Sequence, residues 1–189
     1  MKHLIIYAHP NTRSLNGHIK QVIVEHLAKN GHEVKVRDLY QQNFNPILSL
    51  EDLEGQRIGQ VEKDVKIEQN CIVWADCIIF IHPIWWTGLP AVLKGYIDRV
   101  FSYGFAYRYD HGIQKGLLEG KQAVVINTQG KSHAEYGDLG MDKALKLTSD
   151  RGIYTYCGLD VKHHLFFDQA DRATSETIEK WGRKIKSIF

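Results

Sequence analysis

Two adjacent tryptophans, Trp85 and Trp86, lie just after an apolar run, Cys77–Ile81, and just before a helical pattern. The run is predicted to be a buried strand, and Pro83 ends it. A buried indole N–H needs a hydrogen-bond partner, so packing alone rarely places two tryptophans side by side. Aromatic side chains on a strand-to-helix turn therefore predict a platform for a flat ring, which is chemistry typical of a flavin enzyme.

A polar loop, His9–Asn16, follows the first predicted strand and leads into a helix. Free backbone N–H groups and the positive end of the helix dipole make such a turn a natural anion site. Ser14 and Asn16 can donate hydrogen bonds there, and His9 and Arg13 can add positive charge. The alternative is that Ser14 only caps the helix. Neither G-x-x-x-x-G-K-[ST] nor a G-x-G-x-x-G after a strand is present, which argues against the usual nucleotide loops.

A third loop, Asn127–Gly130, offers a hydroxyl, amide groups and a glycine that would permit close approach. Taken alone, this segment could equally be an ordinary turn. In a parallel sheet, this loop, the His9–Asn16 loop and the Pro83–Gly88 turn all meet at the carboxyl edge. A phosphate site beside an aromatic wall matches a flavin mononucleotide, FMN.

These loops need a framework of strands that alternate with helices. Strands are predicted over His3–Ala8, Glu33–Leu39, Asp76–His82, Lys121–Asn127 and Asp160–Phe167. Helices are predicted over Leu15–Lys29, Val61–Trp74, Leu89–Phe101, Leu139–Arg151 and Ser175–Ile188, and residues 40–60 give no firm pattern. The alternation predicts an α/β fold: a doubly wound five-stranded parallel sheet, order 2-1-3-4-5, with helices on both faces, in a single domain spanning residues 1–189.

Composition excludes several classes of function. The 24 basic and 22 acidic residues give a net charge of +2 without a basic block, so nucleic acid is not an expected partner. The same balance disfavours an electron shuttle, which usually carries an acidic face. The three cysteines form no C-x-x-C pair, which indicates free thiols, with Cys77 and Cys157 buried, and a cytoplasmic location. No apolar run is long enough to cross a bilayer.

The histidines give no metal signal. His163 and His164 are neighbours in a predicted strand, so their rings point to opposite faces of the sheet. There is no H-x-x-x-H or H-E-x-x-H pattern on a helix, and a metal site is not expected. The absence of G-x-S-x-G likewise argues against a serine hydrolase.

Four aromatic side chains cluster around Gly104: Tyr103, Phe105, Tyr107 and Tyr109. One interpretation is a strand-like segment that packs on its own core. The favoured interpretation is a loop that forms a lid or an interface, because exposed aromatic groups mark binding surfaces.

Together these motifs resemble the flavodoxin-like NAD(P)H:quinone oxidoreductases. The small bacterial members are the nearest in pattern, among them general-stress NAD(P)H oxidoreductases and the ancillary oxidoreductases of potassium-efflux systems. The resemblance covers nearly the whole chain, and its most specific motif, H-P-x-x-W-x-x-x-P-x-x-L-K, is matched by His82–Lys94. Further matches are Ala8-His9-Pro10, Asp38-Leu39-Tyr40, Asn43–Pro46, Asp98–Phe101, Phe105–Tyr107 and Tyr156–Gly158.

The resemblance implies a flavodoxin-like fold and a homodimer with the flavin at the subunit interface. It implies that NADH or NADPH donates a hydride to the flavin and that a quinone or similar acceptor then reacts at the same place. Ser14, Leu15 and Asn16 would hold the phosphate, and Tyr107 and Tyr109 would reach the partner's site. The remaining residues expected to contact the flavin are His9, Arg13, Pro83, Ile84, Trp85, Trp86, Thr87, Asn127, Thr128, Gln129, Gly130 and Tyr136.

Three departures from the family pattern bear on the chemistry. Gln129 stands where many members have a glycine. Animal members carry a histidine shortly after the tyrosine that corresponds to Tyr136, but Asp142 stands at that place here. His133 is the only histidine nearby, so Tyr136 and His133 are the expected proton donors. The long C-terminal extension of the animal members is absent, which favours FMN and leaves FAD as the alternative.

Other activities fit the same residues. An azo- or nitro-reductase would differ only in its acceptor. A regulatory subunit of a potassium-efflux system would add peripheral association with a membrane channel. A flavin-free interaction domain with the same sheet is the least chemical alternative.

Overall fold

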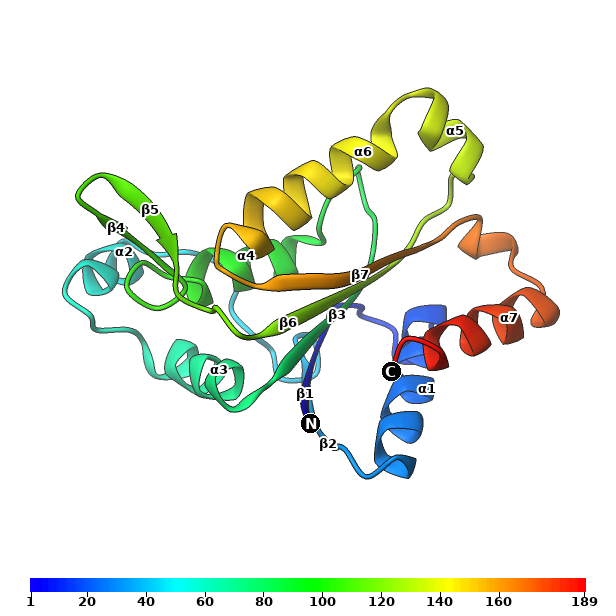
Figure 1. The fold of residues 1–189 in the computed structure, drawn as a ribbon, viewed down its shortest axis with the longest axis horizontal. Coiled ribbons are helices and arrows are strands. Elements are labelled where there is room, and N and C mark those ends of the chain that lie inside the picture. The colour runs from blue at the N-terminus through cyan, green and yellow to red at the C-terminus, as the bar shows by residue number, and fades with distance from the viewer.

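The computed structural model describes residues 1–189, and its centre is a five-stranded parallel sheet (Figure 1). The strands are β1 (Lys2–Tyr7), β2 (Glu33–Asp38), β3 (Cys77–Pro83), β6 (Gln122–Thr128) and β7 (Asp160–Phe167), in the spatial order β2-β1-β3-β6-β7. Counted along the chain, this is the order 2-1-3-4-5, so the predicted doubly wound topology is confirmed. Each predicted strand agrees with an observed one to within a residue at either end.

Helices cover both faces of the sheet, and alternate strand residues therefore enter two separate cores. Leu4 and Ile6 of β1 pack with α3 (Lys63–Trp74) and α4 (Ala91–Val100), whereas Ile5 and Tyr7 pack with α1 (Leu15–Lys29) and α7 (Ser175–Lys186). Burial on both faces explains why the central strands are continuous apolar runs. Each fully buried large aliphatic side chain contributes about 1.5–3 kcal/mol to the free energy of folding.

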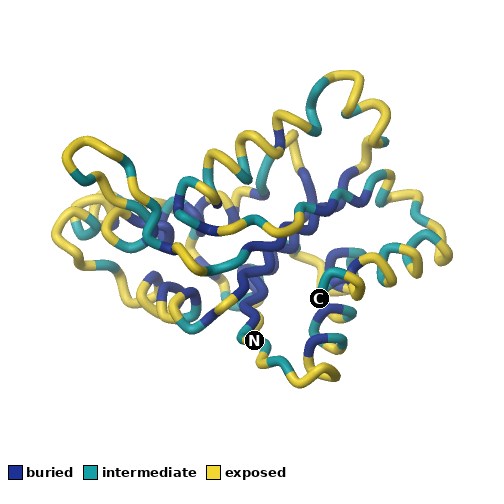
Figure 2. The backbone as a smooth tube through the Cα atoms, viewed as in Figure 1, coloured by how far each residue is buried: buried dark blue, intermediate teal, exposed yellow.

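The burial pattern separates the central strands from the edge of the sheet (Figure 2). All residues of β3 are buried, whereas in β2 only Asp38 is buried. β2 is more exposed because it lies at the edge of the sheet. Cys77 and Cys157 are buried as predicted, and burial raises the pKa of each thiol to about 12.

Helix α1 shows why its bounds could be predicted from sequence. Ile19, Ile23 and Leu27 recur at helical spacing, and all are buried on the face turned to the sheet. Asn30 ends the helix, and Gly31 follows at φ 75°, the left-handed conformation that favours glycine after a helix.

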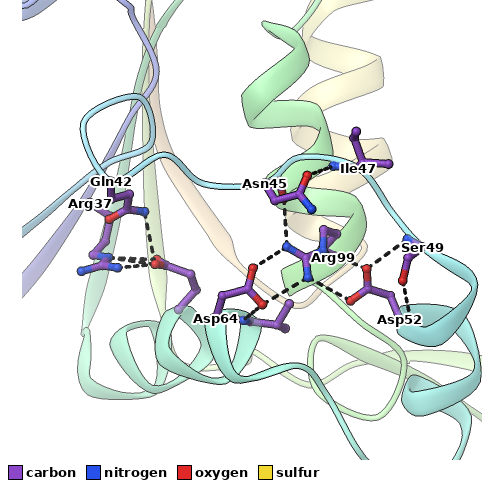
Figure 3. Close-up of polar contacts among 10 residues, drawn as sticks. Arg37, Gln42, Asn45, Ile47, Ser49, Asp52, Asp64 and Arg99 are labelled. Carbon is purple, nitrogen blue, oxygen red and sulfur yellow. Dashed lines mark hydrogen bonds and ion pairs between the residues drawn. The ribbon is translucent and has the colours of Figure 1, made fainter.

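A buried ion cluster ties α4 to α2 (Leu50–Arg57), to α3 and to the segment that precedes α2 (Figure 3). The Arg99 guanidinium donates to Asp52 Oδ2 at 2.9 Å, to Asp64 Oδ2 at 2.6 Å and to the carbonyl oxygen of Asn45 at 2.9 Å. The side chains of Arg99 and Asp52 are each only 4% exposed. Because a charge buried this deeply requires its partner, the cluster fixes the chain on the outer side of α4.

Gly95 within α4 has a steric reason. A Cβ at this position would lie 2.0 Å from the carbonyl oxygen of Pro46. The glycine lets the backbone of Pro46 lie directly on the helix, which explains why a residue of poor helix propensity stands within α4.

The structure adds elements that the sequence did not predict. Helix α2 occupies part of the unassigned stretch 40–60, and β4 (Tyr107–Asp110) pairs with β5 (Ile113–Gly116) as an antiparallel hairpin outside the main sheet. The aromatic run is therefore partly a strand: the predicted loop holds for Tyr103 and Phe105 but is wrong for Tyr107 and Tyr109. The remaining elements are α5 (His133–Asp138), α6 (Met141–Lys146), the π-helix η1 (Leu147–Thr155) and the 3₁₀ helix η2 (Ala170–Arg172).

The predicted helix over Leu139–Arg151 is also corrected. Gly140 adopts a left-handed φ of 69°, so α6 begins only at Met141. The helix then widens into η1 and continues to Thr155. No helix of the structure is both long and apolar enough to span a bilayer.

Candidate active site

The three predicted loops meet at the carboxyl edge of the sheet and are bonded to one another. Asn16 Nδ2 donates to Thr128 Oγ1 at 2.8 Å, which links the first loop to the third. The backbone N–H of Ile84 donates to the carbonyl oxygen of Thr128 at 2.8 Å, which links the second to the third. The rings of His9 and Trp85 have centroids 5.8 Å apart, which places the first loop beside the second. The sequence prediction of a shared rim is thus confirmed in geometry.

The first loop ends at the N-terminus of α1. Ser14 Oγ accepts a hydrogen bond from the Gly17 N–H at 3.2 Å, so Ser14 is an N-cap. The N–H groups of Leu15 and Asn16 have no partner within the protein and are available to an anion. Arg13 is exposed, and its side chain is not engaged in an ion pair.

His9 belongs to this loop but is turned toward its own backbone. Its Nδ1 lies 3.0 Å from the amide nitrogen of Asn11 and 3.1 Å from the carbonyl oxygen of that residue. Burial lowers the pKa of His9 below its usual value, and the hydrogen bond with Asn11 only partly opposes that effect. His9 therefore contributes less positive charge to the loop at neutral pH than the sequence suggested.

The second loop is a tight turn with strained backbone. Trp85 and Gly88 exchange backbone hydrogen bonds of 3.2 and 3.1 Å. The two central residues, Trp86 and Thr87, have φ of 50° and 54°. Left-handed φ at both central positions is the pattern of a type I′ turn, which favours Asn and Gly and disfavours a bulky or β-branched residue. The Trp86 side chain is 100% exposed, so no packing compensates this strain.

A cavity of about 340 Å³ opens between this turn, the end of β6 and the α6–η1 segment. It contains Ile84, Thr87 and Asn127, which were predicted to contact the flavin. The other lining residues are His82, Gly88, Leu89, Lys94, Leu145, Thr148, Ser149, Ile153 and His164.

Two lining histidines were not among the predicted site residues. His82 and His164 are joined through the side chain of Asn127, and His164 in turn contacts Asp150. Burial lowers the pKa of His82 to about 4, so its imidazole is neutral at physiological pH. Sequence offered one signal for His82, since it heads the His82–Lys94 motif. It offered none for Asp150, which is distant along the chain.

The proposed proton donors lie in a neighbouring cavity. Tyr136 and His133, both on α5, line a space of about 230 Å³ together with Gln129 and His164. The backbone N–H of His133 donates to Asp168 Oδ2 at 2.9 Å. This space does not include the tryptophan turn, so the catalytic roles of Tyr136 and His133 stay predictions.

The third loop carries both buried and exposed positions. Asn127, Thr128 and Gln129 are buried, and the backbone N–H of Gln129 donates to the carbonyl oxygen of Phe167 at 2.9 Å. Gly130 is exposed, has no left-handed φ, and would place a Cβ only against Asp171 at 3.8 Å. Nothing within the protein itself therefore requires glycine at this position.

The hairpin tyrosines occupy an adjoining surface. Tyr107 is half-buried and lines a cavity of about 270 Å³ that shares Lys94 and Ile153 with the larger one. Tyr109 is 52% exposed, and its hydroxyl lies 3.0 Å from that of Tyr156. Their contribution to a partner's site stays a prediction.

Two orphaned polar atoms indicate that the rim fits a cofactor. Asn16 Oδ1 and Gln129 Oε1 are buried without a hydrogen-bond partner. Buried polar groups nearly always have a hydrogen-bond partner, so a ligand or ordered water is expected to donate to these two oxygen atoms. With the free N–H groups of α1 and the exposed indole of Trp86, the rim has the polar and aromatic contacts that FMN would need. No group of three or more His, Cys, Asp or Glu side chains is arranged to hold a metal ion.

Comparison with known proteins identifies the family of this chain. A family model described as a flavodoxin-like fold matches residues 1–188. A protein of Haemophilus influenzae named an uncharacterized NAD(P)H oxidoreductase is 42% identical over 99% of this chain and 95% of its own. NAD(P)H dehydrogenase [quinone] 1 of Cavia porcellus is 34% identical over 98% of this chain and 76% of its own.

Solved structures share the fold. The NAD(P)H:quinone oxidoreductase of Methanothermobacter marburgensis superposes with a TM-score of 0.89 at 27% identity, over 99% of this chain and 96% of that one. General stress protein 14 of Treponema denticola, solved in complex with FMN, superposes with a TM-score of 0.71 at 24% identity, over 100% of this chain and 97% of that one. This chain belongs to the flavodoxin-like family of NAD(P)H oxidoreductases and quinone reductases.

Proposed function

We propose that this protein is an FMN-dependent NAD(P)H oxidoreductase that reduces quinones or similar acceptors by two electrons. One observation carries the proposal: three loops distant in sequence are bonded together at one sheet edge, around orphaned polar atoms and an exposed tryptophan. The relatives named as NAD(P)H oxidoreductases and quinone dehydrogenases support the same reaction class. FMN rather than FAD is favoured by the FMN-bound neighbour, which shares the fold.

Different residues of the chain would bind the phosphate and the ring of FMN. The free N–H groups of Leu15 and Asn16 at the α1 N-terminus would hold the phosphate, with Arg13 supplying charge. Trp86 and Ile84 would contact the ring, and Gln129 would accept a hydrogen bond through its orphaned oxygen. When bound, FMN supplies the redox chemistry, by which NAD(P)H and the acceptor react in turn.

The site would be completed by a second subunit. Several large apolar and aromatic side chains of the tryptophan turn, the β4–β5 hairpin and the segment from α5 to η1 are exposed in the single chain, and exposed apolar groups are typical of interfaces. They are Trp86 (100%), Leu139 (76%), Ile113 (66%), Leu147 (66%) and Tyr109 (52%). A homodimer in the cytoplasm, with Tyr107 and Tyr109 reaching the partner, is the proposed assembly. Association with a membrane efflux system stays a prediction from the resemblance.

A simple experiment tests the proposal. The purified protein should be yellow or should become so with FMN, and the absorbance of the bound flavin should bleach on anaerobic addition of NADH or NADPH. Addition of a quinone in the absence of oxygen should restore it. A protein that binds neither FMN nor FAD, or whose bound flavin is not reduced by either nucleotide, would refute the proposal. Replacing the quinone by an azo dye or a nitroarene in the reoxidation step identifies the preferred acceptor.

A further inference from the structure

Four side chains form one continuous polar chain, and three of them, His82, Asn127 and His164, line the 340 Å³ cavity. Asp150 Oδ1 lies 2.7 Å from His164 Nδ1, and His164 Nε2 lies 2.6 Å from Asn127 Oδ1. Asn127 Nδ2 lies 3.0 Å from His82 Nε2. Finally, His82 Nδ1 lies 3.0 Å from the carbonyl oxygen of Pro83, at the start of the tryptophan turn.

The orientation of the Asn127 amide fixes the protons in this chain. Its Nδ2 also lies 3.3 Å from the carbonyl oxygen of His82, so the reversed amide would set two acceptor oxygens against each other. Asn127 Oδ1 must therefore face His164 Nε2, and that nitrogen must carry a proton to donate. The other ring nitrogen, Nδ1, faces the carboxylate of Asp150 and donates as well. A proton on each nitrogen would make His164 an imidazolium.

At the other end of the chain the second histidine is neutral. His82 Nδ1 donates to the Pro83 carbonyl, which leaves Nε2 to accept from Asn127 Nδ2. Every donor then meets an acceptor, and a single positive charge remains, on His164. The charge is buried, since the side chain of His164 is 4% exposed.

His164 lines the cavity, but its carboxylate partner, Asp150, does not. No acidic residue is among those that line the cavity. The only other charged lining residue is Lys94, whose ammonium is already paired with both carboxylate oxygens of Asp98 at 2.6 and 2.8 Å. Ile84, Leu89, Leu145 and Ile153 supply apolar walls. An apolar slot with one buried cation suits a flat ring that carries a delocalised negative charge.

We infer that His164 is a specificity-determining residue, and that this cavity prefers planar aromatic acceptors carrying an ionised hydroxyl beside a carbonyl, such as hydroxyquinone anions. The inference rests on the proposed function, because the cavity shares Ile84, Thr87 and Asn127 with the predicted flavin contacts. Asp150 and Asn127 are positioning residues that contact the two ring nitrogens of His164 and orient its ring.

The test compares two ligands of matched shape by calorimetric titration of the FMN-loaded protein, without NAD(P)H. Lawsone, a hydroxynaphthoquinone, is an anion at neutral pH, and its methyl ether is neutral. The protein should bind lawsone at least about tenfold more tightly, and His164→Gln should remove most of that difference while changing affinity for the ether less than about threefold. His163→Gln is the matched control, because the adjacent His163 is exposed, and it should leave both affinities unchanged.

A second readout does not depend on any variant folding well. In protein labelled with ¹⁵N-histidine, both ring nitrogens of His164 should be protonated at neutral pH, and Asp150→Asn should abolish this. A singly protonated His164, or equal affinity for the two ligands, overturns the inference. If the protein still holds FMN and reduces the neutral quinone, the proposed function stands despite that result. A protein without flavin that still prefers lawsone supports the inference and refutes the proposed function.

Discussion

The tryptophan turn predicts a conflict between stability and cofactor binding. Trp86 and Thr87 both hold left-handed φ, and both side chains are exposed. Such backbone conformations cost about 1–3 kcal/mol for each non-glycine residue. Trp86→Asn with Thr87→Gly installs the preferred Asn-Gly pair of a type I′ turn. We therefore expect the double variant to be more stable than the natural chain.

The size of the gain follows from the terms in the structure. Relief of the backbone strain at the two positions stabilises the folded state by about 2–6 kcal/mol. The added glycine opposes this by about 0.5–1 kcal/mol, because it raises the conformational entropy of the unfolded chain. The 100% exposed indole contributes no burial that could be lost, and Thr87 loses only an exposed 2.7 Å hydrogen bond to the Trp86 carbonyl. At the lower end, the net gain after the glycine cost is about 1–1.5 kcal/mol, or about 2–6 °C in Tm for a chain of this length.

Urea unfolding of the flavin-free protein measures this gain, and fluorescence titration with FMN measures the accompanying loss. Stacking on an aromatic side chain is worth about 1–3 kcal/mol, so FMN affinity should fall about tenfold or more. Trp86→Ala is the control, because it removes the indole but keeps a Cβ at left-handed φ. It should lose FMN affinity without gaining stability. A double variant no more stable than the natural chain would refute the strain argument, and unchanged FMN affinity would remove Trp86 from the cofactor site.

Three further changes test other parts of the structure. Arg99→Met leaves the buried Asp52 without its partner and should lower the free energy of unfolding, measured in urea, by about 3–5 kcal/mol. Adding Asp52→Asn should recover much of that loss. A loss under about 1 kcal/mol would contradict the role of the cluster. Gly95→Ala places a Cβ 2.0 Å from the Pro46 carbonyl oxygen and should lower the free energy of unfolding by about 1–3 kcal/mol. Gly182→Ala in α7 brings its Cβ within 4 Å of no other atom and should raise the free energy of unfolding by about 0.5–1 kcal/mol. Similar effects at both sites would refute the steric explanation. His82 has a pKa of about 4 in the folded protein and 6.5 in the unfolded chain, so the unfolded chain binds more protons between these pH values. The free energy of unfolding should therefore fall by up to about 3 kcal/mol as the pH is lowered through that window. His82→Asn should make the free energy of unfolding less dependent on pH, and an unchanged pH dependence would exclude His82 as its source.

The parts of the fold that could be predicted are those fixed by local pattern. The five sheet strands were found because burial on both faces leaves long apolar runs. α1 was found because its cap, its buried face and its terminal glycine all agree. The β4–β5 hairpin had a local signal that was overlooked: His111-Gly112 is a two-residue loop with φ of 50° and 79°, of the kind that closes hairpins.

Other features depend on contacts that no local pattern encodes. Helix α2 is held by its capping box and by Asp52 against Arg99, and its own sequence has almost no apolar face. The π-helix η1 cannot be predicted from spacing, since it departs from the regular helical repeat. For the site, the three loops could be placed from topology, whereas the cavity depends on how η1 packs over β7.

The choice between His163 and His164 shows where strand periodicity stops being sufficient. Alternation correctly assigns the two rings to opposite faces but does not say which ring meets Asn127. A register shift between Ala123 and Val124 decides it: Ala123 pairs with Val161 but Val124 pairs with His163, so Lys162 is an extra residue. Because of that insertion His164 aligns with Val125, on the face that Asn127 shares, and so meets Asp150 of η1. Without the extra residue, His163 would align with Val125 instead of His164. Leu165 and Phe167 would then point to the opposite face of the sheet, away from the core that they share with α1 and α7. Burial of those two side chains, and not any property of the histidines, therefore selects which imidazole lies in the cavity wall.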